Sequence, residues 1–146
     1  MADMNRRIDM QTCRHHHEAI RILLSYFPSA EPFDPAKVHG TLQRLATVLL
    51  RHLRLEDEFL YPILEDSDDR TVRETAHRYR EEMGGLSAEF GTLLARWGQN
   101  GSITASPAEF LDAWKPFRGR LEVRMAKEDN GLYAIADAYL TEDRGA

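Results

Sequence analysis

The sequence contains a single cysteine, Cys13, among 146 residues, so no disulfide can form within the chain. It also lacks any apolar run long enough to span a membrane. Its first residues, MADMNRRIDM, lack the apolar centre of a signal peptide. Together these absences favour a cytoplasmic protein that contacts no membrane.

An excess of basic residues is missing as well. Nineteen Lys and Arg are scattered among 24 Asp and Glu, and the net charge is −5. A nucleic-acid-binding protein needs a basic face, so we expect no nucleic-acid partner. With 42% hydrophobic and 29% charged residues, the composition is that of a globular chain. Its length suits one domain with a real core, and we expect residues 1–146 to form that single domain.

No segment alternates with period two, and the chain instead divides into helical segments. Asp34 and Ser106 each precede a proline, which predicts two capped helix starts. Apolar positions recur in steps of three and four, as the seams of a bundle do. Short connections between such helices predict an all-α fold, an antiparallel up-down-up-down four-helix bundle. The segments are expected at about 8–27, 35–66, 70–98 and 107–140.

Polar side chains interrupt these apolar seams on the first, second and fourth segments. His52 and Glu56 are four residues apart, so they project from one face of a helix and can share an ion. In an antiparallel bundle all the interrupting positions come to roughly one level. Two imidazoles and two carboxylates converging in a bundle core are typical of a metal site. The interrupting residues are His17, His52, Glu56, Arg124 and Glu128.

A purely structural interpretation competes for each of these residues taken alone. Buried polar groups are commonly satisfied by their neighbours, and a buried Glu commonly pairs with an Arg. Several such positions on three helices, at one level, are harder to explain in that way. The joint pattern favours a polar site that binds a metal or has lost one.

The motifs resemble the haemerythrin-like (HHE cation-binding) family. The second segment reads HLRLEDEFLYP from His52 to Pro62, similar to the family's His-x-x-x-Glu element before an aromatic residue and proline. The first segment contains RHHHEAIRILL, and its hydrophobic register selects His17 over His15 and His16. The fourth segment contains RMAKEDNGLY, which places its Glu at the same distance before a Tyr as the second segment does.

The resemblance implies a non-haem, usually di-iron, centre in which Glu56 and Glu128 would bridge the metals. His17 and His52 would then serve one iron. Arg124 stands where the family has a histidine, and a guanidinium has no lone pair with which to bind a cation. His77 lies about 130° from the apolar stripe of its own segment. It is therefore a candidate ligand only if a break at Gly84–Gly85 turns it inward.

Arg124 leads to a specific expectation about charge. Without a second metal, Glu56 and Glu128 would be left as buried like charges. A guanidinium is always charged and can donate to two carboxylates, so we expect Arg124 to occupy the volume of the missing metal and to pair with one or both glutamates. The alternative is that Arg124 extends along its alkyl stem and keeps its head in water.

Three functions remain open at this stage. The leading hypothesis is a metal-binding domain that senses, carries or stores oxygen, another small diatomic ligand, or iron itself. Its cofactor would be non-haem iron, mononuclear or incompletely dinuclear. The second hypothesis is a metal-free bundle that acts as a protein-interaction or regulatory module, which Arg124 favours. The third hypothesis is a metal-dependent oxidoreductase. It is favoured less, because the sequence indicates no substrate pocket.

Overall fold

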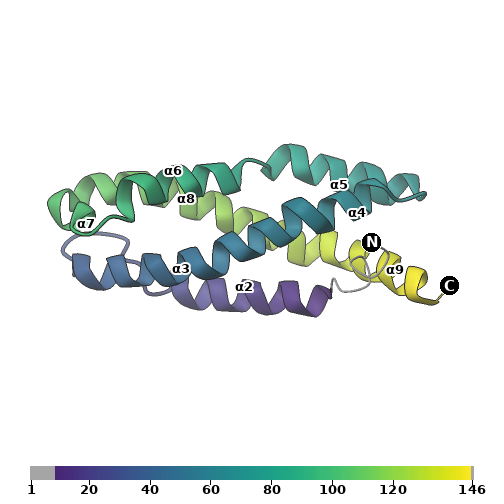
Figure 1. Cartoon of the computed structure of the whole chain (residues 1–146), viewed down its shortest axis with the longest axis horizontal. Helices are drawn as coiled ribbons and strands as arrows, with labels where there is room; N and C mark the ends of the chain where they lie inside the picture. The colour runs from purple at the N-terminus through teal and green to yellow at the C-terminus, as the bar shows by residue number, and fades with distance from the viewer. Residues whose placement is uncertain (1–8, 146) are drawn as a thin grey trace.

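The computed structural model describes residues 9–145, with side chains described as far as Leu140. Every regular element in this range is a helix, which confirms the predicted all-α class (Figure 1). The expected helix start near residue 8 and the two ends of the expected 1–146 domain lie outside the described residues. The elements are α2 (Met10–Leu24), α3 (Pro35–Leu55), the π-helix η1 (Glu56–Leu60), α4 (Tyr61–Glu65), α5 (Arg70–Met83), α6 (Leu86–Trp97), α7 (Ser102–Ala105), α8 (Pro107–Lys127), the π-helix η2 (Glu128–Leu132) and α9 (Tyr133–Gly145).

The elements join into long stretches that lie side by side as a helical bundle (Figure 1). The segments α3, η1 and α4 follow one another without a gap, and so do α8, η2 and α9. Helix α2 packs on α3, α4 packs on α5, and α6 packs on α8. No helix of the described residues is both long and apolar enough to cross a membrane.

The two predicted capped starts have different outcomes. The carboxylate of Asp34 accepts hydrogen bonds from the backbone N–H groups of Ala36 and Lys37, as a helix N-cap should. Helix α8 does begin at Pro107, but the side chain of Ser106 makes no capping hydrogen bond. The prediction of a serine cap there is wrong, and the fixed φ of the proline is the local signal that remains.

The third predicted helix, 70–98, is divided into α5 and α6. Gly85 has a φ of 87°, in the left-handed region that glycine adopts at little cost, and Gly84 is extended. The prediction of one continuous helix is therefore wrong at this point. Seam residues on both sides, such as Ala76 and Phe90, are nevertheless buried. The break thus redirects the chain without turning its apolar stripe out of the core.

Two apolar clusters fill the interior, and the polar residues lie between them along α2 and along the two continuous stretches that contain η1 and η2. The first cluster contains Leu45, Phe90 and Trp114 from α3, α6 and α8. The second contains residues of α4, α5 and α9. On α2, His17 separates Cys13 of the second cluster from Ile20 of the first. The bundle core therefore consists of two apolar halves with a polar layer in the middle.

Gly131 allows α5 to approach the π-helix η2 closely. A Cβ atom added at Gly131 would lie 2.3 Å from the hydroxyl oxygen of Tyr79 on α5. Outside the local backbone of Gly131, the only other atom within 4 Å of this Cβ would be Cζ of the same tyrosine, at 3.5 Å. The contact thus depends on the absence of a side chain at one position and on the hydroxyl at the other.

We predict that Gly131→Ala destabilises the protein by about 1–3 kcal/mol, because the added methyl overpacks the contact with Tyr79. In a Tyr79→Phe background the same change should instead stabilise by about 0.5–1 kcal/mol, since alanine is the better helix former. Urea unfolding of the four proteins measures both effects. An equal effect of Gly131→Ala in the two backgrounds would contradict this interpretation of the contact.

Candidate metal centre

Three long helical stretches supply the polar layer. His17 comes from the middle of α2, His52 from the last turn of α3, and Arg124 from the last turn of α8. Glu56 and Glu128 are the first residues of η1 and η2. All five residues are at most 1% exposed. Every polar interruption of the apolar seams is therefore buried.

Two imidazoles and two carboxylates converge within this layer. One ligand atom from each of His17, His52, Glu56 and Glu128 lies within 4.8 Å of the others. The two imidazole Nε2 atoms are 3.0 Å apart. His17 Nε2 lies 3.2 Å from Glu128 Oε1, and His52 Nε2 lies 3.2 Å from Glu56 Oε1. The arrangement offers two nitrogen and two oxygen donors to one point.

Arg124 lies between the two glutamates and does not extend to water. Its Nη2 donates to Glu56 Oε1 over 3.1 Å, and its Nε donates to Glu128 Oε2 over 3.2 Å. The same Nη2 contacts Asp57 Oδ1 at 3.1 Å, and Nη1 contacts the carbonyl oxygen of Met83 at 3.4 Å. Met83 is the last residue of α5, so the helix break leaves its carbonyl free for this contact. Each of the three guanidinium nitrogens therefore has at least one hydrogen-bond acceptor.

Two tyrosines bind the glutamates crosswise. Tyr61, which follows η1, donates to Glu128 Oε2 over 3.0 Å. Tyr133, which follows η2, donates to Glu56 Oε2 over 2.5 Å, and its oxygen lies 2.9 Å from His17 Nε2. Each carboxylate therefore accepts a hydrogen bond from a tyrosine hydroxyl of the other helical stretch.

In the sequence motifs these tyrosines serve only as markers of spacing, and their contacts with the glutamates were not predicted. In an α-helix, residues five apart lie about 140° apart, so a tyrosine five residues after a buried glutamate is not expected to face the same layer. A π-helix winds more loosely, with bonds from residue i to i+5, which brings the two positions closer to one face. Glu56 and Glu128 both open such a segment. The feature of the sequence that could have indicated these tyrosine contacts is the repeated Glu-Asp-x-x-Leu-Tyr pattern.

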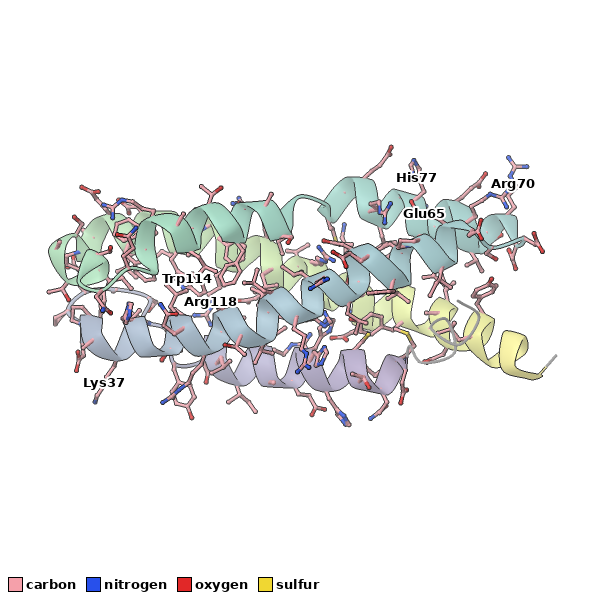
Figure 2. The ribbon with its side chains drawn as sticks, in the orientation of Figure 1. Lys37, Glu65, Arg70, His77, Trp114 and Arg118 are labelled. Carbon is pink, nitrogen blue, oxygen red and sulfur yellow. The ribbon has the colours of Figure 1, made fainter. Side chains whose placement is uncertain are left out.

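His77 does not join the cluster. The break at Gly84–Gly85 is present, but it leaves the His77 side chain 61% exposed on the outer face of α5 (Figure 2). There its two ring nitrogens lie 3.2 Å from Glu65 and 3.1 Å from Glu81. The imidazole takes part in a surface ion-pair network.

The charges of the layer are set by burial and by Arg124. Burial, together with the charge of Glu56, raises the pKa of Glu128 well above its usual value. Burial also raises the pKa of Glu56, but His52 and Arg124 outweigh it and hold that pKa below the usual range. Burial lowers the pKa of His17, so its imidazole is neutral at pH 7. In the metal-free layer, burial and the charge of Glu56 thus oppose ionisation of Glu128, whereas His52 and Arg124 favour the ionised form of Glu56.

The donors of the cluster fit a single cation. Neutral imidazole nitrogen and carboxylate oxygen suit iron, zinc and manganese, and the buried layer excludes bulk water. Four donors leave positions open on a metal that prefers five or six ligands. A bound cation would also lower the cost of ionising both glutamates, because its charge offsets the burial and the repulsion by Glu56 that raise the pKa of Glu128.

Residues 9–136 match the family described as Hemerythrin HHE cation binding domain. The matched range includes all five residues of the polar layer. Searches of curated proteins and of solved structures returned no match.

We predict that Glu128→Gln leaves the metal-free protein at least as stable as the wild type at pH 7, because burial and the charge of Glu56 disfavour the ionised carboxylate and an amide carries no charge. A carboxyl whose pKa is raised in the folded state stabilises fully below its ordinary value, here 4.5, and loses that contribution as the pH rises. The advantage of Glu128→Gln should therefore grow from pH 4.5 upward. Urea unfolding in the presence of a chelator measures it.

The double variant Glu56→Gln/Glu128→Gln provides the contrast. It removes both carboxylates of the layer, which leaves Arg124 buried without a buried anion and should cost about 3–5 kcal/mol. A single Glu128→Gln that loses as much as the double variant would show that both glutamates are ionised in the metal-free protein.

Proposed function

This chain belongs to the hemerythrin HHE cation-binding family, and we propose that it binds one non-haem metal ion, iron, in its polar layer. The observation that carries the proposal is the convergence of four buried donors, from His17, His52, Glu56 and Glu128, within 4.8 Å. These residues would hold the ion. Bound iron supplies redox capacity and open coordination positions for a small ligand.

Arg124 limits the site to one ion in this proposal. A dinuclear centre would balance its two carboxylates with two cations, and the guanidinium already contacts both carboxylates. It therefore supplies one of the positive charges that a second metal would otherwise supply. Arg124 also fills the side of the cluster that faces Met83 and α5. We infer that the half of the site served by α2 and α3 is the half that keeps its metal.

The proposed role is that of a sensor, carrier or store of oxygen, of a related small ligand or of iron. The burial of every donor supports this role, because a layer with side chains at most 1% exposed admits small ligands rather than extended substrates. We propose a cytoplasmic, single-domain protein in which this binding role is favoured over an oxidoreductase activity. The proposal includes the antiparallel up-down-up-down order of the long helices, which the course of the ribbon in Figure 1 supports.

A metal-free interaction module is the second candidate, and one observation favours it. Arg124, Tyr61 and Tyr133 together satisfy both glutamates by hydrogen bonds without any ion. A polar layer that is satisfied in this way can fix the packing of a bundle on its own. Metal analysis separates the two candidates.

We predict about one iron per chain after anaerobic loading of the purified, untagged protein with Fe(II). His52→Ala should abolish binding, because it removes one of the two nitrogen donors. His77→Ala is the matched control, since His77 lies on the surface, and it should bind as the wild type does. Elemental analysis gives the stoichiometry. Two tightly held irons, or a loss of binding in His77→Ala, would contradict a single-ion site of this composition.

Arg124 provides a separate prediction with two variants. Arg124→Ala should destabilise the metal-free protein by about 3–5 kcal/mol, because it leaves the buried carboxylates without their cation. Arg124→His replaces the guanidinium with an imidazole that can bind a metal, and it should raise the uptake of Fe(II) above that of the wild type. An unchanged melting temperature in the first variant and unchanged uptake in the second would show that Arg124 does not replace a metal.

A further inference from the structure

Each histidine of the cluster turns its second ring nitrogen to a polar partner outside the cluster. His17 directs Nε2 to the glutamates and Nδ1 to Asp129 Oδ1, at 2.8 Å. The other oxygen of Asp129 accepts from Nη2 of Arg21 over 2.5 Å. Asp129 is thus held by two residues of α2. These are Arg21 at the surface and, one helical turn earlier, the buried His17.

His52 has a partner of a different kind. Its Nδ1 lies 3.0 Å from Nδ1 of His16, and the two rings meet edge to face. The hydrophobic register selected His17 over His16, but the structure places His16 half-buried against His52.

We propose that Asp129 and His16 are positioning residues, which keep the proton of His17 and of His52 on Nδ1 and so aim both Nε2 atoms at the metal. This proposal rests on the proposed function. A neutral imidazole carries one proton, and the nitrogen that keeps it cannot bind a metal. An outer acceptor therefore decides which nitrogen serves as the ligand, and it holds the plane of the ring.

The other half of the layer lacks this arrangement, which supports the assignment. Asp57 occupies the same place after Glu56 that Asp129 occupies after Glu128. Its carboxylate, however, contacts Arg124 at 3.1 Å and no imidazole. The half of the layer with His17 and His52 thus has outer partners for its imidazoles. Among the described residues, the half with Arg124 has none.

The test compares Asp129→Ala with Asp137→Ala. Asp137 is the matched control, because it also links α2 to the last helical stretch through an arginine, Arg14, at 2.6 Å and touches no imidazole. Co(II) is the metal probe, since its visible absorption reports both occupancy and coordination. Asp129→Ala should weaken Co(II) binding by about 10–100-fold, and Asp137→Ala should leave it unchanged.

A second readout needs no metal. Nitrogen NMR of histidine-labelled, metal-free protein reports which ring nitrogen carries the proton. We expect His17 on the Nδ1–H form in the wild type, because a carboxylate can only accept, and loss of that preference in Asp129→Ala. Without metal, His52 Nε2 lies 3.0 Å from His17 Nε2 and can donate to it, so the role of His16 is tested with the metal bound. His16→Ala should weaken Co(II) binding, and His16→Gln, which offers a carbonyl oxygen to His52 Nδ1, should restore it.

The outcomes separate the two proposals. A wild-type protein that takes up no Co(II) overturns the proposed function. A metal-free wild type in which His17 keeps its proton on Nε2 overturns the positioning role. Equal Co(II) affinity in Asp129→Ala and Asp137→Ala overturns it as well.

Discussion

The contact of one guanidinium with two buried carboxylates is the interaction on which the polar layer depends. Glu56 and Glu128 would repel each other in a layer without water, and Arg124 lies within 3.2 Å of an oxygen of each. Desolvating such groups is costly unless every charge is paired and hydrogen-bonded. The crossed tyrosines and the free carbonyl of Met83 complete that pairing. The break between α5 and α6 is thus part of the same arrangement as the buried arginine.

The layer is built from two similar stretches of chain that differ at their first position. His52-Leu-Arg-Leu-Glu-Asp and Arg124-Met-Ala-Lys-Glu-Asp both enter a π-helix at the glutamate, and both continue to Leu-Tyr. In the first stretch the leading residue donates a nitrogen to the cluster. In the second it donates hydrogen bonds to the carboxylates. A single difference of residue type therefore gives one half of the layer a metal-binding character and the other half a fixed positive charge.

The all-α class and the polar layer could be predicted from the sequence because both depend on helical periodicity. The apolar steps of three and four predicted which face of each helix is buried, and His17, His52 and Glu128 interrupt that face. The tyrosine contacts could not be predicted, since a π-helix changes the relation between spacing and direction. The break at Gly85 depends on a left-handed residue that the apolar stripe does not reveal. The half-buried position of His16 follows from tertiary packing alone.

The central claim is that Arg124 takes the place of a second metal, and anomalous diffraction at the iron edge tests it most directly. Crystals of the Fe(II)-loaded protein should show one anomalous peak, close to the Nε2 atoms of His17 and His52. The guanidinium of Arg124 should keep its contacts with Glu56 and Glu128 in the same map. Two peaks bridged by the glutamates, with Arg124 displaced from between them, would contradict the account.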